Sequence, residues 1–373
     1  MAKPPKKRLR SGFTTGTAAA AAAKGAMIRI LDNEKPEQVT VMLLTGQPIT
    51  IAVHSCTGMG NTSAACSVIK DAGDDPDVTH KAEIGAVVTL LKSSTARRGE
   101  YTVVIGGGRG VGTVTKPGLA VPPGEPAINP GPRRMITQSI IDVLERRHLR
   151  LPVRVEVFVP EGQVLAEKTL NARLGILGGI SILGTTGVVT PMSHDAYIAT
   201  IESAVSVAWA SGLNHLVLTT GRRSERYAES VFPQLPGEAF VQAGDFFKLS
   251  LEATTRKGFK HITLAVFFGK ALKMACGVPH THAAKSSLSL ERLAEWADQA
   301  TGDPNIAEDI RSANTARHAF GMIHATHATI VALVGNRVLE AAKGFAGPGI
   351  RIQAIIFGYD GSIAYDSEKE LRD

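Results

Sequence analysis

The sequence predicts two domains, an α+β domain followed by a smaller α/β domain with a parallel, Rossmann-like sheet. The 373 residues are enough for about two domains, each with its own core. Up to about Pro191, strand-like segments follow one another through short turns, which is typical of a mixed α+β domain. After Pro191, strands alternate with helices, and this alternation indicates a parallel sheet with helices on its faces. We therefore expect a disordered basic tail at residues 1–10, the α+β domain at 11–190 and the α/β domain at 191–373.

In the first domain, the elements follow from residue preference and from alternation of apolar and polar residues. Segments rich in alanine or in long, unbranched side chains favour helices, which we expect at Thr17–Leu31, Ser63–Asp71 and Arg133–Arg147. Segments that are β-branched or alternating favour strands, which we expect at Val39–Leu44, Ile49–Val53, Glu83–Leu91, Tyr101–Ile105 and Val153–Val159.

In the second domain, short apolar runs predict buried strands at Leu213–Thr219, Ala239–Ala243, His261–Phe267 and Arg351–Phe357. Helical segments lie between them, at Ala196–Ala210, Ser224–Val231, Phe246–Arg256, Gly269–Gly277, Ser289–Gln299, Ile306–Arg317 and His327–Lys343. This order of elements predicts a doubly wound parallel sheet.

The composition is that of a soluble globular protein, with 44% hydrophobic and 20% charged residues. The net charge of +7 comes mainly from the tail, because without its five Lys and Arg residues 36 basic side chains face 34 acidic ones. The charge therefore gives little support to nucleic-acid binding. No segment approaches the length of a membrane span, and the three cysteines form neither a CxxC pair nor a metal-ligand spacing. We expect a cytoplasmic protein without a membrane or nucleic-acid partner.

A loop of hydroxyls and glycines, Ser11 to Thr17, runs directly into six alanines. Thr17 is expected to be the N-cap, because its hydroxyl can accept hydrogen bonds from the first free N–H groups of the helix. The helix would then present a bare N-terminus to an anion. An ordinary capped surface helix is the alternative. We take Thr14, Thr15 and Thr17 as candidate ligands of a substrate carboxylate.

The segment from Asp71 to His80 contains four carboxylates and one imidazole. Carboxylates that lie close together raise one another's pKa, so one of them is a candidate base. We take Asp74 and His80 as candidate catalytic residues. A turn with solvated charges is the alternative, and a calcium loop is disfavoured because the spacing is not that of an EF-hand.

A glycine loop, Gly106 to Gly112, follows a predicted strand but is followed by a further strand-like segment instead of a helix. The dinucleotide-binding interpretation therefore fails. Either the loop is a simple glycine-rich hairpin, or its backbone N–H groups around Gly108 bind carboxylates. Lys116 follows, and Arg133 and Arg134 open a predicted helix, where guanidinium groups can grip carboxylates unless one of them simply faces water.

In the second domain, the strand that ends at Thr219 turns tightly into a helix, the usual position of a ligand in doubly wound sheets. Asp245 follows the next strand, where an acid can bind the ribose of an adenosine, although a helix-capping role would explain it equally well. We take Thr219, Gly221, Glu225 and Asp245 as candidate cofactor ligands. His280 and His282 have the spacing of metal ligands, but no third ligand is evident, and we expect no protein-bound metal.

Several of these blocks, in this order, resemble the cobalt-precorrin-5B C(1)-methyltransferases of anaerobic cobalamin biosynthesis. They are the Ser11–Thr17 loop with its alanine helix, the Asp71–His80 segment, the glycine loop with Lys116-Pro117-Gly118 and Asn129-Pro130, and Thr281-His282. The resemblance runs from about Leu9 to Tyr365 and departs from the family pattern at Lys285-Ser286-Ser287, where acidic and Arg residues are expected.

The resemblance implies transfer of a methyl group from S-adenosylmethionine, as a co-substrate, to C1 of a cobalt-bound tetrapyrrole, giving cobalt-precorrin-6A. It also implies a first domain similar to domain 2 of ribosomal protein S5, and a substrate-binding role for His282. Two alternative functions stay open, a nucleic-acid-binding S5-like module and a nucleotide-dependent phosphotransferase. The oligomeric state is open as well, including a homo-oligomer.

Overall fold

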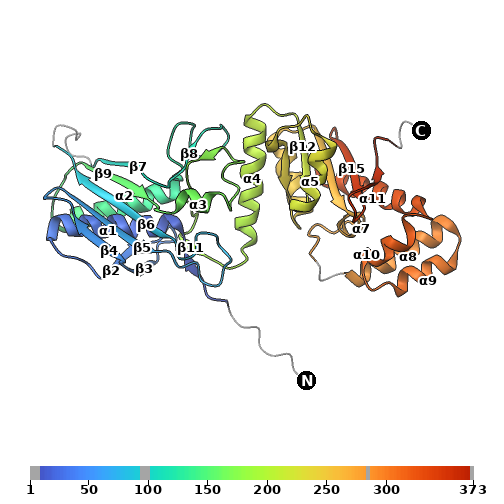
Figure 1. Cartoon of the computed structure of the whole chain (residues 1–373), viewed down its shortest axis with the longest axis horizontal. Coiled ribbons are helices and arrows are strands. Elements are labelled where there is room, and N and C mark those ends of the chain that lie inside the picture. Colours follow the sequence, from blue (N-terminus) through green and yellow to red (C-terminus); the bar gives the residue numbers. More distant parts are fainter. Residues whose placement is uncertain (1–8, 93–100, 283–285, 370–373) are drawn as a thin grey trace, which may run out of the picture. The chain divides into compact units, whose positions relative to one another are not determined.

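The computed structural model describes residues 9–92, 101–282 and 286–369, which divide into two compact units, Met1–His194 and Asp195–Asp373 (Figure 1). Most of the predicted basic tail, residues 1–8, lies outside the described residues. None of the helices in the described part of the chain is long and apolar enough to cross a membrane. Each unit has its own hydrophobic core, so each is described by itself.

The first unit is built on a five-stranded sheet in the order β4-β5-β6-β9-β7. Its strands are β4 (Ser55–Gly58), β5 (Ser63–Ile69), β6 (Glu83–Leu90), β9 (Val153–Phe158) and β7 (Val103–Gly107). Neighbours are antiparallel except β7, which runs parallel to β9. Three smaller antiparallel pairs complete the unit: β2 (Gln38–Met42) with β3 (Pro48–Ala52), β1 (Gly12–Phe13) with β11 (Val188–Val189), and β8 (Thr113–Val114) with β10 (Ile176–Leu177).

Two helices, α1 (Thr15–Asp32) and α2 (Pro130–Arg146), pack on each other, and α1 crosses β5 and β6. A short helix α3 spans Gly162–Ala166. Every residue of α1 from Thr15 to Met27 is buried, so this part of the helix is enclosed on all sides, while its last turn is half-buried. Alanine suits that position because its small side chain lets strands and a second helix approach the helix backbone closely.

The second unit contains a five-stranded sheet in the order β13-β12-β14-β15-β16. The strands are β13 (Phe240–Gln242), β12 (His215–Thr219), β14 (His261–Phe267), β15 (Arg351–Phe357) and β16 (Ile363–Asp366). The first four are parallel and β16 is antiparallel. The chain passes from β12 to β13 on one side and then to β14 on the other, so the strand order reverses between β12 and β14. Ligands of doubly wound sheets bind at such a reversal.

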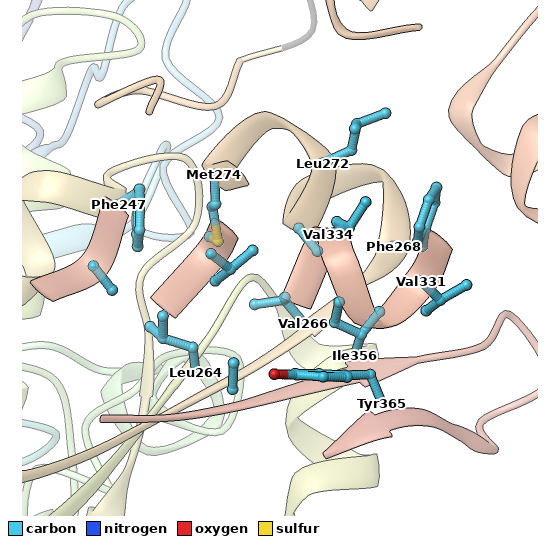
Figure 2. Packing of buried hydrophobic residues seen from close by; sticks show 14 of the residues in the cluster. Phe247, Leu264, Val266, Phe268, Leu272, Met274, Val331, Val334, Ile356 and Tyr365 are labelled. Atoms are coloured by element: carbon cyan, nitrogen blue, oxygen red, sulfur yellow. The ribbon is translucent and has the colours of Figure 1, made fainter. Parts of the chain in front are cut away.

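Helices cover both faces of this parallel sheet. Helices α4 (His194–Ala210), α6 (Phe247–Lys257), α7 (Phe268–Ala275) and α11 (Ala328–Ala346) share the larger core with α8 (Ser286–Thr301), α9 (Pro304–Ser312) and α10 (Ala316–Ile323). Helix α5 (Arg222–Val231) contributes to a smaller core on the other face, near a 3-10 turn at Gly237–Ala239. Figure 2 shows the larger core, in which side chains of α6, α7 and α11 pack onto the strands.

The predicted mixture of helices with parallel and antiparallel strands is confirmed, with two corrections to the elements and one disulfide that was not expected. The segment Ser63–Asp71 is strand β5 instead of a helix, because its small residues alternate toward α1 and pair with β4 and β6. The predicted helix Ile306–Arg317 is divided between α9 and α10, since Thr315 caps a new helix there. Cys56 and Cys66 lie opposite each other on β4 and β5 as a disulfide that the spacing did not predict, and Cys276 is free.

Candidate functional site

The start of α1 is capped by Thr14, not by Thr17 as predicted. Thr14 has extended backbone geometry, and its Oγ1 accepts a hydrogen bond from the N–H of Thr17 at 3.2 Å. Thr17 lies one turn inside the helix, where it is fully buried and donates from its hydroxyl to the Gly187 carbonyl at 2.7 Å. The cap is therefore three residues earlier than the alanine run suggested.

The N-terminus of α1 is also covered, so the expectation of a bare helix end is wrong. The N–H of Gly16 donates to the carbonyl of Leu183 at 3.1 Å, and Thr15 Oγ1 accepts from the N–H of Leu183 at 2.9 Å. Thr14 packs against Gly184, where an added Cβ would lie 2.5 Å from Thr14 Oγ1. The hydroxyls of Thr15 and Thr17 thus hold the segment 181–187 in place, while that of Thr14 caps the helix, and the role of all three as substrate ligands stays a prediction.

The acidic segment 71–80 binds the chain's own N-terminal segment. The guanidinium of Arg10 pairs with both carboxylate oxygens of Asp71, and this hydrogen bonding lowers the pKa of Asp71 to about 2. Asp74 is exposed, and its Oδ2 accepts from the backbone N–H of Arg10 at 2.7 Å. His80 Nδ1 accepts from the N–H of Ala72 at 3.1 Å and lies 4.0 Å from Asp71 Oδ1. Asp71 is therefore not the carboxyl with a raised pKa that was expected within this segment, and the catalytic roles of Asp74 and His80 stay predictions.

Lys70, a buried lysine in this unit, was not among the candidate site residues predicted from the sequence. Its side chain is 1% exposed, pairs with the carboxylate of Asp77 and donates to Thr79 Oγ1 at 2.7 Å. Burial lowers the pKa of Lys70, and the negative charge of Asp77 opposes that effect. Burial alone would raise the pKa of Asp77, but the charge and hydrogen bond of Lys70 bring it below its usual value. The two side chains thus form a largely buried ion pair in the first unit.

The glycine loop packs against other backbone segments. An added Cβ at Gly110 would lie 1.9 Å from the carbonyl oxygen of Val159, and one at Gly179 would lie 2.2 Å from the carbonyl oxygen of Gly110. Gly108 donates from its N–H to Val157 at 2.7 Å. Three backbone segments thus cross where only glycine fits. The hairpin interpretation also needs correction, because β8 after the loop pairs with β10 and not with β7.

The basic side chains near this loop differ in how far they are engaged. Arg133 donates from Nε to the Ile128 carbonyl at 2.9 Å and lies 3.6 Å from a carboxylate oxygen of Glu125. Lys116 is half-buried, with its stem against Gly175. Arg134, in the first turn of α2, is exposed and has no polar partner among the described residues. Of these three cations, Arg134 is the one free to receive a ligand carboxylate.

In the second unit, the predicted cofactor ligands gather at the carboxyl ends of β12 and β13. Thr219, the last residue of β12, is fully buried, and its hydroxyl has no hydrogen-bond partner within the described residues. It lines a small cavity of about 10 Å³ beside Thr220 and Ala243. Buried hydroxyls are nearly always hydrogen-bonded, so this one calls for an explanation. It stands where the strand order of the sheet reverses.

Asp245 follows β13 and forms an ion pair with Lys270, a residue that sequence reasoning missed. Its Oδ1 also accepts from the hydroxyl of Thr281 at 3.0 Å. Burial alone would raise the pKa of Asp245, but the hydrogen bond and charge of Lys270 lower it. The carboxylate is therefore ionised, with Oδ2 left free of polar partners among the described residues.

Glu225 and Tyr197 lie in the same neighbourhood. Glu225, in α5, is buried and accepts from Gln242 Nε2 at 3.2 Å. Tyr197 stacks on Phe246 with ring centroids 5.2 Å apart. Burial raises the pKa of Tyr197, and the charges of Asp245 and Glu225 raise it further, which places both carboxylates near the phenol. Gly221 caps α5 next to this group.

His282 is exposed and stacks beside His280, with ring centroids 6.2 Å apart. It belongs to the second unit, whereas the other candidate substrate ligands belong to the first. The departure from the family pattern at Lys285-Ser286-Ser287 begins outside the described residues. Within the described parts of the chain, no group of three His, Cys, Asp or Glu side chains is placed to hold a metal ion.

Comparison with known proteins identifies the family. The family model described as CbiD matches residues 2–191, and the model described as the CbiD C-terminal domain matches residues 280–368. The chain belongs to the CbiD family. A cobalt-precorrin-5B C(1)-methyltransferase of Geobacter sulfurreducens is 44% identical over 362 residues, covering 96% of this chain and 99% of the relative. The enzyme of the same name from Priestia megaterium is 45% identical over 314 residues, covering 84% of this chain and 83% of the relative.

Another relative with that name, from Geobacillus kaustophilus, is 42% identical over 357 residues, covering 95% of this chain and 94% of the relative. A crystal structure of a cobalamin biosynthesis protein, CbiD, from Archaeoglobus fulgidus is 30% identical, with a TM-score of 0.39, covering 70% of this chain and 78% of that one. The predicted family is thus confirmed by sequence similarity over nearly the whole chain.

Three residues of the groups described above were not predicted from the sequence, namely Lys70, Tyr197 and Lys270. Lys270 lies 25 residues from the carboxylate it pairs with, inside a segment that is otherwise an ordinary amphipathic helix. The one signal for Lys70 is its position directly after an apolar strand, opposite an aspartate seven residues on. Neither spacing distinguishes a paired lysine from a solvated one.

Proposed function

We propose that this chain is a methyltransferase that uses S-adenosylmethionine to methylate C1 of cobalt-precorrin-5B, giving cobalt-precorrin-6A. The observation that carries the proposal is the similarity, over 96% of the chain, to a relative named for this reaction. The names of the relatives give no support to the nucleic-acid-binding or phosphotransferase alternatives. A cytoplasmic location and the absence of a protein-bound metal stay predictions.

The methyl donor fits the carboxyl edge of the second unit's sheet. S-adenosylmethionine, when bound, supplies an electrophilic methyl carbon on a sulfonium and leaves as S-adenosylhomocysteine. Asp245 Oδ2 has no hydrogen-bond partner among the described residues, so it can accept from ribose hydroxyls. The unpartnered hydroxyl of Thr219 lies at the end of the neighbouring strand β12. Glu225 adds a second negative charge that favours a sulfonium cation. Gly221 keeps the turn into α5 free of a side chain.

The chain's other contribution is to orient the acceptor carbon and to exclude water, because displacement at a methyl carbon requires in-line approach. Arg134, Lys116 and Arg133 are proposed to bind substrate carboxylates in the first unit. The backbone of Gly108, the three threonines at 14, 15 and 17, and His282 in the second unit are further candidates.

For proton transfer, His80 is the better of the two candidates. Its Nδ1 accepts a backbone hydrogen bond, so in the neutral ring the proton is on Nε2, which is the atom left to exchange with a ligand. Asp74 is exposed, and its Oδ2 already accepts from the backbone N–H of Arg10. We also propose that the first unit is similar to domain 2 of ribosomal protein S5, on the basis of its helix pair packed on one mixed sheet.

The test of the function is methylation of cobalt-precorrin-5B by the purified chain with isotopically labelled S-adenosylmethionine. One labelled methyl group is expected in the product, read by mass spectrometry, and no transfer under conditions where the Geobacter relative is active would overturn the proposal.

The test of the donor site is calorimetry with S-adenosylhomocysteine. Asp245→Asn should weaken binding by about ten-fold or more, because it removes a charged acceptor. Asp303→Asn is the matched control, since Asp303 caps α9 and is not among the candidate ligands. Equal affinity of Asp245→Asn and the wild type would contradict the placement.

A further inference from the structure

Two arginines and two aromatic rings form a connected group at the carboxyl ends of β14 and β15. Phe267 ends β14, and Tyr359 lies two residues after β15. Their rings are stacked, with centroids 5.7 Å apart and an angle of 10° between the planes. The guanidinium of Arg223 lies 5.0 Å from the centroid of Phe267, and that of Arg317 lies 4.9 Å from the centroid of Tyr359. Stacking on rings holds the two cations in defined positions.

Neither cation is neutralised by a carboxylate in the described part of the chain. Arg223 and Arg317 are exposed, and no carboxylate lies within ion-pair distance of either guanidinium among the described residues. Other arginines of this unit differ, since Arg256 pairs with Glu202 at 2.9 Å. Asp360 directly follows Tyr359 in the chain, but its Oδ1 accepts from the hydroxyl and the N–H of Ser362. The two guanidiniums therefore keep donors free for an external carboxylate.

The group is fixed by its surroundings. Arg223 donates to the backbone carbonyl of Tyr359, and the ring of Phe320 stands nearly edge-on to Tyr359 at 5.7 Å. Gly269 lies against both Tyr359 and helix α10, and a side chain there would crowd the hydroxyl of Tyr359. An added Cβ there would lie 3.1 Å from Tyr359 Oη and 3.5 Å from the Cβ of Ala316. The arrangement is thus preorganised in the absence of a ligand.

A hollow adjoins this group on the α10 side. It has a volume of about 590 Å³ and is lined by Thr315, Arg317, His318, Gly321 and Met322. The hollow is open to solvent over most of its extent, so it is a shallow surface depression and not an enclosed pocket. Arg317 is common to the hollow and to the aromatic group, so a ligand held by its guanidinium would reach into both.

We propose that Arg223 and Arg317 bind carboxylates of the tetrapyrrole substrate, with Tyr359 and Phe267 supporting the two guanidiniums. The inference rests on the proposed function, because a polycarboxylated tetrapyrrole is the acceptor named for the relatives. It adds a substrate subsite in the second unit. None of the site residues predicted from the sequence belongs to this subsite. A flat macrocycle with acidic side chains needs such forked cationic donors at its rim.

The test compares Arg223→Gln and Arg317→Gln with Arg256→Gln. Arg256 lies in the last turn of α6, just before β14 begins, and so at the opposite edge of the same sheet. Each of the first two variants should raise KM for cobalt-precorrin-5B by about ten-fold or more, the effect of losing one charge-assisted contact. The affinity for S-adenosylhomocysteine should stay unchanged in calorimetry, and Arg256→Gln should behave as the wild type in both assays.

A second readout separates this inference from the proposed function. Binding of uroporphyrin, a polycarboxylated tetrapyrrole, is measured by quenching of tryptophan fluorescence, with its methyl ester as the uncharged comparison. Loss of uroporphyrin binding in both arginine variants, with partial rescue by Arg317→Lys, supports the subsite even if the wild type fails to methylate cobalt-precorrin-5B. Wild-type KM and wild-type uroporphyrin affinity in folded Arg223→Gln and Arg317→Gln would overturn it, as would a wild type that neither methylates nor binds either tetrapyrrole.

Discussion

Acidification from about pH 7 to about pH 4.5 should destabilise the second unit through a pair of stacked histidines. His215 and His261 face each other at the amino ends of β12 and β14, with ring centroids 3.7 Å apart. Burial, then the neighbouring ring and the Arg351 guanidinium, lower the pKa of His215 to about 4. Burial and Arg351 lower the pKa of His261 as well, while Glu368, which pairs with Arg351, opposes that effect.

The direction and the size of this change in the free energy of unfolding follow from proton linkage. The unfolded chain binds a proton at His215 below a pKa of about 6.5, but the folded unit does not bind it until about pH 4. The neutral ring therefore stabilises the fold at neutral pH relative to acid, and this stabilisation is lost progressively as the pH falls between those two values. A pKa shift from 6.5 to about 4 corresponds to roughly 3 kcal/mol, which we reduce to about 2 kcal/mol because the ring is only half-buried.

The assay is urea unfolding followed by tryptophan fluorescence at a series of pH values. Both tryptophans, Trp209 and Trp296, lie in the second unit, so the signal reports on that unit alone. His215→Gln keeps a donor for Thr263, which His215 contacts at 2.8 Å, but cannot titrate. Wild type should lose about 2 kcal/mol more than this variant over the acidification. Parallel pH profiles of the two proteins would refute the reasoning, and the exposed His318→Gln should follow the wild type.

Three further outcomes are expected. Thr219→Val should leave the free energy of unfolding unchanged or raise it by about 1 kcal/mol, since it removes an unpartnered buried hydroxyl, yet weaken S-adenosylhomocysteine binding several-fold in calorimetry; unchanged affinity would exclude the hydroxyl as a ligand. Gly335→Ala in α11 should destabilise the second unit by about 1–3 kcal/mol, because its Cβ would lie 2.2 Å from the ring of Tyr365, whereas Gly344→Ala on the same helix meets nothing and should stabilise it by about 0.5–1 kcal/mol. Lys70→Met should lower the stability of the first unit by about 2–4 kcal/mol in circular-dichroism melts by leaving its carboxylate partner unpaired, and no change would show that the buried pair contributes nothing net.

The second unit was easier to predict from the sequence than the first. Parallel strands that are covered on both faces read as continuous apolar runs, and the bounds of β14 and β15 agree with the predicted segments. In the first unit, β5 was mistaken for a helix because alanine and serine have no strong preference for strands. What makes Ser63–Ile69 a strand is its place between β4 and β6 beneath the alanines of α1. That is a tertiary effect that no local window contains.

The candidate site residues also differ in how far the sequence predicts them. Residues that follow a strand in sequence, such as Thr219 and Asp245, could be predicted because parallel strands end at one edge of the sheet. The aromatic group could not, because Arg223 contacts Tyr359 across 136 residues of sequence. The hairpin interpretation of the glycine loop was wrong for a related reason. Gly110 is needed where backbone segments cross, and the sequence does not distinguish such a crossing from an anion-binding loop.

The carboxyl edge of the second sheet carries two opposite kinds of charge, and the proposed reaction needs both. Asp245 and Glu225 stand near the ends of β12 and β13, where negative charge favours a sulfonium donor. Arg223 and Arg317 stand at the ends of β14 and β15, where free guanidiniums favour a polyanionic acceptor. Since β12 and β14 are neighbours, the two regions adjoin along one edge. Salt should therefore affect the two regions to different extents when they are measured separately. It should weaken uroporphyrin binding strongly, by screening an attraction between several charges, and change S-adenosylhomocysteine binding little, because that ligand carries no sulfonium charge.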